Sequence, residues 1–400
     1  MQNYFYNTNF EAGKVIVDLH KNFIYSPPDD YINQALDGIN FEKVDIIFQP
    51  KKINDETNIG AIILVHLKSK EKSAVIQTIE KLSTNPNVVY AEPNCLSDIY
   101  MIPNDPYFRY LWGMKKIKAP LAWNYSTGNS SAVVGVVDSG IDYNHPDIKD
   151  NMWISADKKY VNGWNFVSDS NDSIDVTGHG THVAGTIGAV GNNHMGVAGV
   201  CWDVKVASLR IGNNLMDLAA AIASINFAIE NNIFILNNSW GGRFYSPSLK
   251  YAIEQYEGLY IVAAGNDGTN NDLTPVYPAS YDSDNIISVA ASNPDDTLTS
   301  FSNYGVKSVD IAAPGSDIFS LSLRGEYSYS NGTSMAAPHV AGAAALLKSY
   351  MPFLTVPEIK NIILSSADKY AALEGKLLTG GILNVYSMIE MANRLTLVPT

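Results

Sequence analysis

The chain has 400 residues, of which 46% are hydrophobic and 17% are charged, so it is long enough for one large domain and a smaller one. Its 27 basic and 40 acidic residues give a formal net charge of −13, which argues against nucleic acid as a partner because phosphate binding needs a basic face. No apolar run reaches membrane-spanning length, so we expect no membrane partner, and the two cysteines, Cys95 and Cys201, make no disulfide framework.

The first part of the chain, residues 13–94, has the pattern of a small α+β unit. Strand-like runs KVIVDL, GAIILVHL and NVVYAEPN accompany one helix-like run, SAVIQTIEKLST. A connector containing Pro103 and Pro106 follows over residues 95–113. The opening stretch MQNYFYNTNFEAGK has no apolar run like that of a signal peptide, so we expect either a protein that stays inside the cell or a leader before this start.

A larger α/β pattern occupies the rest of the chain. Its strand candidates are AVVGVV, VKVASLRI, NIFILNNS, LYIVAAG, NIISVAAS and SVDIAAP. Its helix candidates are HGTHVAGTIGAV, LAAAIASINFAIEN, SPSLKYAIEQYE and the run after Ser334. Near-continuous apolar strands that alternate with helices predict a buried, mostly parallel sheet, and ligands bind such sheets beyond the carboxyl ends of the strands.

Two of the polar residues near these strand ends have more than one interpretation. Asp138 ends the run AVVGVVD, where an aspartate also makes an ordinary turn. His179 opens the run HGTHVAG and could be a capping or core histidine. It could also form a metal pair with His182, three residues on. Hydrolytic zinc sites use H-E-x-x-H, and the glutamate of that motif is absent here, so the sequence disfavours zinc.

Two further residues are equally ambiguous when taken alone. Asn266 in VAAGNDG suits a turn, but an amide on a loop beyond a strand can also donate to an oxyanion. Ser334 in NGTSMAAPHVAG suits a helix cap followed by a tolerated proline, Pro338. It could instead be a nucleophile, provided that a base and an orienting acid lie nearby.

The four motifs together closely resemble those of the subtilisin-like serine proteases, or subtilases, and in particular those of the thermitase-like members of that family. They are DSGID, HGTHVAG, VAAGNDG and GTSMAAPHVAG. The resemblance covers about residues 104–393, and residues 13–97 are similar in pattern to the inhibitory propeptides of that family. It implies a subtilisin-like three-layer α/β domain with a mostly parallel central sheet over residues 114–393. A small α+β propeptide domain would precede it, joined through a connector and calcium arm at 98–113.

The resemblance implies a role for each of the four polar residues. His179 would remove the proton of Ser334 and deliver it to the leaving amine, while Asp138 would hold the imidazole tautomer. The Asn266 amide and the backbone N–H of Ser334 would form the oxyanion hole at the helix N-terminus.

The run NNSWGG matches the family strand that pairs with an extended substrate. By this resemblance the substrate-binding residues are Ser239, Trp240, Gly241, Ala264, Gly265 and Val276. Val276 would form the floor of the primary pocket, where relatives often have a smaller or polar residue. Asp267, next to the oxyanion asparagine, would instead favour a basic or polar side chain, so the preference of the pocket stays open. The run LRIGNN lacks the glycine-rich stretch common in the family at this point.

A structural Ca²⁺ site is also implied, because DYNHPDI, VGNNHMGV and PNDPYF resemble the calcium loop and arm of the family. The ligands carried over are the side chains of Asp105, Asp147 and Asn193 and the carbonyls of Val190, Met195 and Val197. A second, weaker site could use Asp169, Asp172 and Asp175, although such an acidic run is more often a solvated loop.

The function implied is that of a serine endopeptidase acting on polypeptides and made as an autoprocessed proenzyme, with its own propeptide as an intramolecular inhibitor. We expect the processing cut at Tyr100–Met101 and an extracellular or secreted enzyme, with a cytoplasmic one as the alternative. Two other functions use the same residues: a catalytically silent subtilase-fold binding module, and an esterase or acyltransferase. Hydrolysis of a protein, compared with hydrolysis of a small ester, discriminates between them.

Overall fold

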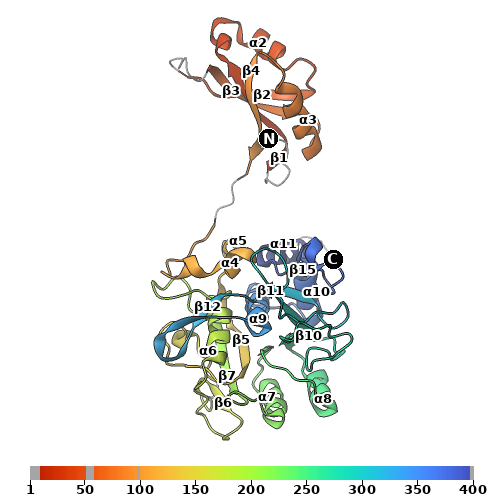
Figure 1. The fold of residues 1–400 in the computed structure, drawn as a ribbon. Helices are drawn as coiled ribbons and strands as arrows, with labels where there is room; N and C mark the ends of the chain where they lie inside the picture. Colours follow the sequence, from red (N-terminus) through yellow and green to blue (C-terminus); the bar gives the residue numbers. More distant parts are fainter. Residues whose placement is uncertain (1–9, 51–57, 97–99, 397–400) are drawn as a thin grey trace. The chain divides into compact units, whose positions relative to one another are not determined.

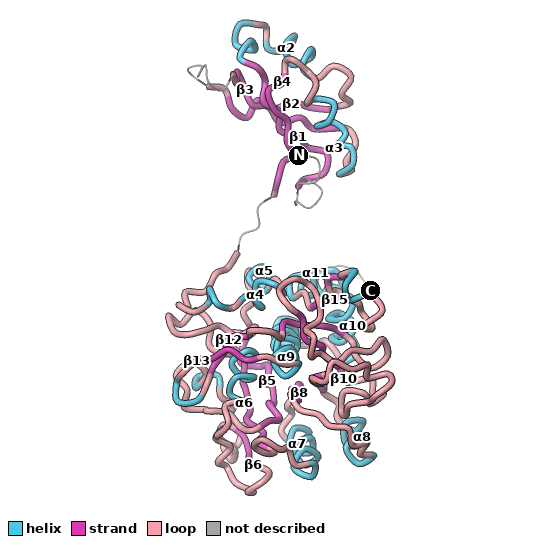
Figure 2. Tube along the Cα trace, in the orientation of Figure 1, coloured by secondary structure: helices cyan, strands magenta, loops and turns pink. Residues whose placement is uncertain are grey.

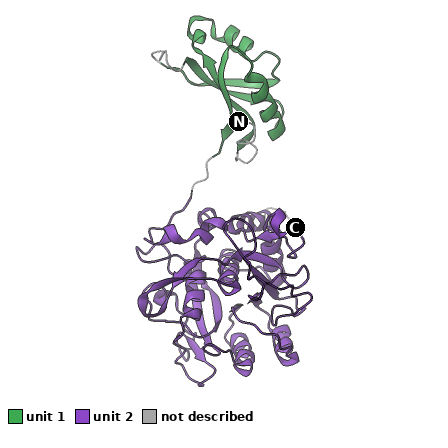
Figure 3. Ribbon diagram, in the orientation of Figure 1, with its two compact units in different colours: residues 1–98 green, residues 99–400 purple. Residues whose placement is uncertain are grey.

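The computed structural model describes residues 10–50, 58–96 and 100–396. The chain divides into two compact units, Met1–Asp98 and Ile99–Thr400, which Figure 3 shows in green and purple. Each unit has a hydrophobic core of its own, as an independently folding domain does. Across the described residues, no helix combines the length and the apolar character needed to cross a bilayer.

The first unit is an antiparallel four-stranded sheet with strand order β2-β3-β1-β4 (Figures 1 and 2). Its elements are β1 (Phe10–His20), η1 (Lys21–Tyr25), α2 (Pro28–Ala35), β2 (Phe41–Phe48), β3 (Ile59–Leu67), α3 (Lys72–Leu82) and β4 (Val88–Cys95). Alternate side chains of β1, namely Val15, Val17 and Leu19, are fully buried in one cluster with side chains of both helices. The unit is therefore an α+β sandwich with one covered face.

The sequence pattern predicted three of these strands and α3 but missed α2 and β2. β2 is an edge strand whose side chains are mostly exposed, so its run FEKVDIIF lacks the clean alternation of a half-buried strand. α2 starts at a Pro-Pro pair that is more typical of a turn, and only Tyr31 and Ala35 of its residues are buried.

The second unit is built on a nine-stranded sheet with strand order β14-β15-β11-β10-β9-β8-β5-β7-β6. Its strands are β5 (Gly128–Asp138), β6 (Gly163–Asn165), β7 (Asp203–Arg210), β8 (Ile235–Asn238), β9 (Leu259–Ala263), β10 (Ile286–Ser292), β11 (Ile311–Pro314), β14 (Asp368–Lys369) and β15 (Gly381–Ile382). All pairs in this sheet are parallel except β14 with β15. A hairpin of β12 (Ile318–Leu321) and β13 (Tyr327–Ser330) stands apart from it.

Helices cover both faces of this sheet, and the fold is the predicted three-layer α/β architecture (Figure 1). The helices are η2 (Phe108–Tyr110), α4 (Trp112–Lys116), α5 (Ala119–Ala122), η3 (Lys149–Asn151), α6 (His179–Gly188), α7 (Leu218–Glu230), α8 (Pro247–Gln255), η4 (Leu323–Gly325), α9 (Thr333–Tyr350), α10 (Val356–Ser365), η5 (Ala371–Leu373) and α11 (Val385–Thr396). One core cluster contains side chains of α6, α9, α10 and α11, and a second contains those of α7 and α8.

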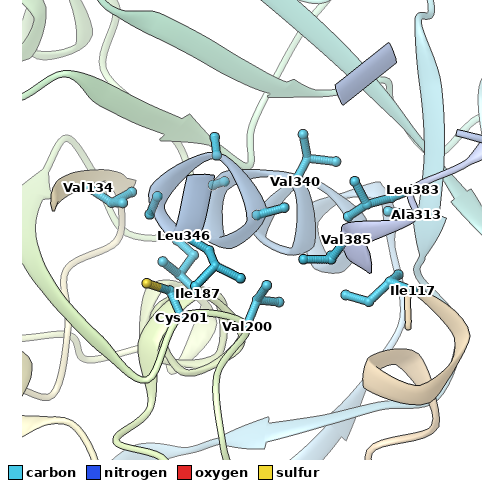
Figure 4. Packing of buried hydrophobic residues seen from close by; sticks show 14 of the residues in the cluster. Ile117, Val134, Ile187, Val200, Cys201, Ala313, Val340, Leu346, Leu383 and Val385 are labelled. Atoms are coloured by element: carbon cyan, nitrogen blue, oxygen red, sulfur yellow. The ribbon is translucent and has the colours of Figure 1, made fainter. Parts of the chain in front are cut away.

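The central helix α9 is buried along nearly its whole length. Figure 4 shows Val340 and Leu346 of α9 among side chains from several other elements, including Ile187 and Val134. An apolar helix buried on every side must be at the centre of the domain, because no face of it can meet water favourably. The start of α9 is thereby held rigidly.

The sheet places the predicted site residues near one edge. Asp138 ends β5, Ser239 directly follows β8, and Asn266 follows β9. Since these strands are parallel neighbours, their carboxyl ends meet at the same edge. His179 and Ser334 lie in the first turns of α6 and α9.

Candidate active site

The carboxylate of Asp138 and the imidazole of His179 form a direct hydrogen bond. The distance from His179 Nδ1 to Asp138 Oδ1 is 2.8 Å, and the backbone N–H of Ser139 donates to the same oxygen at 2.7 Å. The Asp138 side chain is fully buried, whereas that of His179 is 35% exposed. Because a carboxylate can only accept, Nδ1 carries the proton, and Nε2 is left as the basic nitrogen.

The environment of His179 favours its protonated form. Burial lowers the pKa of His179, but attraction to the Asp138 carboxylate and the hydrogen bond to it, with a smaller contribution from Asp175, outweigh burial and leave the pKa above the ordinary 6.5. An imidazole in this setting accepts a proton more readily than a free one.

A buried hydrogen-bond network around Asp175 links the end of β5, which carries Asp138, to the start of α6, which carries His179. Asp175 accepts hydrogen bonds from Ser139 Oγ at 3.0 Å and from Thr181 Oγ1 at 2.7 Å, and Ser139 Oγ accepts from the N–H of Gly180 at 3.0 Å. A Cβ at Gly180 would lie 2.1 Å from the carbonyl oxygen of Gly140, so only glycine allows this approach. Sequence reasoning assigned none of these contacts.

The network also bears on the weaker of the two predicted calcium sites. Both oxygens of Asp175 accept hydrogen bonds inside the network, and Asp172 Oδ1 accepts from the Tyr143 hydroxyl at 3.1 Å. Over residues 10–50, 58–96 and 100–396, no three His, Cys, Asp or Glu side chains are grouped so that they could hold a metal ion. The run SDSNDSID therefore does not gather its carboxylates into a cation site.

Ser334 is bonded reciprocally to Ser239, at the end of β8. Ser334 Oγ donates to the carbonyl oxygen of Ser239 at 3.0 Å, and Ser239 Oγ donates to the carbonyl oxygen of Ser334 at 2.9 Å. The second bond has a cause in the sequence, since Pro338 has no N–H for the carbonyl four residues before it. Ser239 supplies the donor that Pro338 lacks, and so ties the start of α9 to the neighbouring strand.

The amide of Asn266 is oriented by the residue before Ser334. Asn266 Oδ1 accepts from both the N–H and the hydroxyl of Thr333, each at 2.9 Å. Its Nδ2 therefore points elsewhere, and a Cβ placed on Gly332 would lie 3.5 Å from this Nδ2 and 3.5 Å from the N–H nitrogen of Ser334. Two nitrogens that can donate hydrogen bonds thus lie near the same point at Gly332, and an oxyanion needs such a pair of donors.

The loop that carries Asn266 is braced by a fully buried asparagine, Asn303. Its Oδ1 accepts from the N–H groups of Asp267 at 2.9 Å and Thr269 at 3.1 Å, and its Nδ2 donates to the Ala264 carbonyl at 3.2 Å. Nothing in the run FSNYG distinguishes this asparagine from a turn residue, and sequence reasoning missed it.

Two of the predicted pocket residues, Gly241 and Gly265, lie close to a third, Val276, which is 5% exposed. Its Cγ1 lies 3.2 Å from the position of a Cβ on Gly241 and 3.5 Å from that on Gly265. The segments that contain these two glycines thus both lie against the Val276 side chain. Ala264, in the second segment, is fully buried, and Gly242 exchanges backbone hydrogen bonds of 2.8 and 2.7 Å with Tyr277.

A groove of about 610 Å³ has His179 and Trp240 in its lining. Its lining comprises Thr177, His179, Asn213, Asn214, Leu215, Met216, Leu218, Ser239, Trp240, Gly241, Gly242, Phe244, Leu249 and Tyr277. Leu215 and Phe244 are 88% and 76% exposed, so two large apolar side chains stand at its rim. Sequence reasoning did not select them, since exposure of a loop side chain leaves no local pattern.

Two of the predicted calcium ligands, Asp105 and Asp147, are buried close to one another. Asp147 Oδ1 accepts from Asn193 Nδ2 at 2.8 Å, and its Oδ2 accepts from the N–H of Val197 at 2.9 Å. Asp105 Oδ2 accepts from the N–H of Asn192 at 2.6 Å, but its Oδ1 has no hydrogen-bond partner among the described residues. The structure brings the arm and the predicted loop together.

The electrostatics of these two carboxylates are unfavourable without a cation. Burial, and to a smaller extent repulsion from Asp105, raises the pKa of Asp147 to about 7 although hydrogen bonds to it act in the opposite direction. Burial likewise raises the pKa of Asp105. Val190 and Met195 lie on the same loop, where the N–H of Val190 donates to the Asp147 carbonyl at 2.8 Å. An orphaned carboxylate oxygen beside a second buried carboxylate fits a hard cation such as Ca²⁺.

Comparison with known proteins agrees with this geometry. A family model described as "Subtilase family" matches residues 129–382. The chain is 37% identical to a thermophilic serine proteinase of Bacillus sp. (strain AK1), covering 78% of this chain and 75% of that protein. It is 36% identical to thermitase of Thermoactinomyces vulgaris, covering 72% and 99%.

The fold has a similar solved counterpart. A protease structure from Pseudoalteromonas arctica PAMC 21717 matches with a TM-score of 0.65 and 29% identity, covering 73% of this chain and all of that one. The matched residues carry the Asp138–His179 pair and both donors beside Ser334. The chain belongs to the subtilase family of serine proteases, and it is a serine endopeptidase that acts on polypeptides.

Proposed function

We propose that Asp138, His179 and Ser334 act as a catalytic triad. The 2.8 Å bond between His179 and Asp138, beside the paired donors at Ser334, is the observation that supports this most directly. As Ser334 Oγ attacks the substrate carbonyl, its proton passes to His179 Nε2, and Asp138 stabilises the imidazolium that forms. Ser334 Oγ must first turn from the Ser239 carbonyl toward His179.

The Asn266 amide and the Ser334 N–H would stabilise the tetrahedral intermediate. Both bind more tightly to an oxyanion than to the ground-state carbonyl, so they accelerate the chemical step itself. His179 then returns its proton to the leaving amine, and water repeats the sequence on the acyl-enzyme. Thr333 acts as a positioning residue because it holds the Asn266 side-chain oxygen.

Substrate would bind as an extended strand. Ser239, Trp240 and Gly241 would supply backbone contacts on one side of the primary pocket, and Ala264 and Gly265 the opposite wall, with Val276 as the floor. Affinity in this mode comes largely from the main chain, while the pocket selects the side chain.

The test is to incubate the purified full chain with an unfolded protein and, separately, with a small ester, and to identify products by mass spectrometry. We expect cleavage of the protein at internal bonds, and a Ser334→Ala variant should be slower by about 10⁶-fold. Esterolysis without proteolysis would favour an acyl-transfer enzyme, and neither reaction would favour a silent binding module.

We also propose that Asp105, Asp147 and Asn193, with carbonyls of Val190, Met195 and Val197, hold a structural Ca²⁺ ion. A bound Ca²⁺ supplies positive charge to the two buried carboxylates and ties the connector to the loop after α6. The Asn193 amide now donates to Asp147 through Nδ2, so binding through its oxygen requires this side chain to turn over.

Residues 13–97, within the first unit, are proposed to be an inhibitory propeptide, removed by a cut at Tyr100–Met101. Tyr100 and Met101 are 56% and 38% exposed, which leaves this bond open to a protease. A Met101 start would keep Asp105 in the catalytic unit, and the Met101 N–H donates to the Pro120 carbonyl at 3.1 Å. N-terminal sequencing of the mature band tests the bond, and a start beyond Asp105 would contradict it.

Processing within the chain is separable from processing by another protease. A Ser334→Ala chain should remain uncut, whereas a Ser334→Ala chain cut at the same bond would show that a second enzyme does it. Proenzymes of this kind accompany secretion, so a secreted location belongs to the proposal, with a cytoplasmic enzyme as the alternative that fractionation of the source cells would reveal.

A further inference from the structure

An ion pair joins the two segments that flank Val276. Arg243 directly follows Gly242 in the first segment, and Asp267 directly follows Asn266 in the second. The distance from Arg243 Nη2 to Asp267 Oδ2 is 2.9 Å. The two side chains are 56% and 52% exposed, so the pair lies at the surface in contact with solvent.

The position of this pair relative to the pocket follows from the glycines on each segment. Gly241 and Gly265 both approach Val276 Cγ1, at 3.2 and 3.5 Å from their Cβ positions. Val276 is almost completely buried while Arg243 and Asp267 are half exposed. The pair therefore links the two segments that approach Val276, and it lies closer to the surface than Val276 does.

Arg243 and Asp267 are the only charged residues in the two segments that approach Val276 and in the segment that contains Val276. Residues 239–243, 263–267 and 276–280 contain no Asp, Glu, Lys, Arg or His except Arg243 and Asp267. With the pair intact, these three segments together carry no net charge. Without Arg243, they would carry one carboxylate without its partner.

We propose that Arg243, through its ion pair with Asp267, makes the primary pocket selective for uncharged side chains and suppresses a preference for lysine and arginine. This inference rests on the proposed function, because it concerns the substrate side chain that enters the same site. A lysine in the pocket would lay its methylenes along Val276 and carry its ammonium group back toward the ion pair. There it competes with Arg243 for the Asp267 carboxylate.

The size of the effect is bounded by the exposure of the pair. Ion pairs of this exposure change equilibria by factors of about 1.4 to 5. We expect a change of selectivity within this range, with no change in the chemical mechanism. Salt should reduce it, since exposed charges are screened at high ionic strength.

The experiment uses two peptides that differ only in the residue before the cut bond, lysine in one and the uncharged methionine of similar length in the other. The measured quantity is the ratio of kcat/KM for the lysine peptide to that for the methionine peptide. Arg243→Gln should raise this ratio by a factor of about 1.4 to 5 over wild type, and Asp267→Asn should lower it. The Arg243→Gln/Asp267→Asn double variant should return it near the wild-type value.

A matched control is the ion pair of Lys118 with Asp368, also at 2.9 Å but outside the wall segments. Lys118→Gln should leave the ratio unchanged. If Arg243→Gln slows or speeds both peptides equally, the pair only supports the structure and the inference is wrong. If Arg243→Gln does not fold, Asp267→Asn tests the inference independently, and an unchanged ratio in that variant would overturn it. A wild type that cleaves neither peptide nor any protein would instead contradict the proposed function.

Discussion

Asp138 and Asp147 are both aspartates with fully buried carboxylates, yet their surroundings differ in kind. Asp138 has a basic partner, the imidazole of His179 at 2.8 Å. The groups that donate to Asp147 are neutral, and a second buried carboxylate, that of Asp105, repels it. The group that faces each carboxylate therefore decides which chemistry that carboxylate can support.

A buried negative charge is stable only when something balances it. At Asp138 the balancing group can gain and lose a proton, so the pair can serve proton transfer. At Asp147 the pKa is raised to about 7 by burial and then by Asp105, which marks a site that lacks positive charge. Under the proposed function a divalent cation would supply that charge without a proton, and this region would serve stability. Substitutions at and around the two aspartates can test whether Asp138 serves proton transfer and Asp147 serves stability.

Among the variants that keep Ser334, the largest effect is expected for Asp138→Asn. Asparagine can donate as well as accept, so His179 no longer keeps its Nδ1 proton and loses the basic Nε2. We expect kcat to fall by about 10⁴-fold while the melting temperature in calcium stays near that of wild type. Steady-state kinetics and thermal unfolding measure the two. Full activity in a folded Asp138→Asn protein would remove Asp138 from the triad.

Asn266→Ala tests an uncharged group of the candidate active site. The amide of Asn266 is held by Thr333 and carries no charge, so its removal leaves both buried carboxylates as they are. We expect kcat to fall by about 10²–10³-fold with little change in KM, because the amide acts in the transition state. A change in KM alone would place Asn266 in substrate binding and contradict the oxyanion role.

Asp147→Ala should affect stability and spare the triad. Calcium at 100 times its Kd would stabilise the folded state by about 2.7 kcal/mol, which corresponds to roughly 5 °C in melting temperature. We expect wild type to lose this amount on chelation and Asp147→Ala to melt at the lower temperature with or without chelator. The measurement is thermal unfolding of forms that also lack the nucleophile, so that self-digestion does not interfere.

The matched control for calcium is Asp175→Asn, since Asp175 is buried but fully engaged by hydroxyl and N–H donors. It should remain sensitive to chelator. A wild type whose melting temperature is indifferent to both calcium and chelator would end the calcium proposal.

The smallest effect is a shift in pH dependence. Burial alone would lower the pKa of His179, but the Asp138 carboxylate raises it above 6.5, and the base works only when neutral. Activity should therefore rise with pH through a midpoint above 6.5. In Asp138→Asn the residual activity should have its midpoint at lower pH, because burial then acts without the carboxylate. A wild-type kcat/KM profile with its acid midpoint below 6.5 would contradict this.

The residues of the candidate site could be predicted from the sequence, whereas the contacts that hold them could not. Asp138, His179, Asn266 and Ser334 sit in short motifs whose residue types the chemistry requires, and the strands and helices around them have strong apolar periodicity. The nine-stranded sheet confirms the predicted mostly parallel architecture. The edge strand β2 was missed because an exposed strand has no such periodicity.

The supporting contacts could not be found in the same way. Asn303, Thr333 and Ser239 look like ordinary turn, cap and strand-end residues in the sequence. Their roles depend on partners far along the chain: Ser239 and Ser334 are 95 residues apart, and Asn303 and Asp267 are 36 apart. No local pattern records such a pairing.

The sequence shows which chemical groups are present. Asp138 ends an apolar strand, and His179 and Ser334 lie at helix starts. Pro338 has no N–H and so leaves the carbonyl of Ser334 without its helical hydrogen bond. The tertiary structure alone decided what each group meets. The carboxyl ends of parallel strands converge at one sheet edge, so sheet order and register bring Ser239 to the orphan carbonyl of Ser334 and Arg243 to Asp267. The fold places the basic imidazole of His179 beside the buried Asp138, but a second carboxylate, that of Asp105, near the buried Asp147. The charge state that each aspartate favours depends on these neighbours, which lie far from it in the sequence.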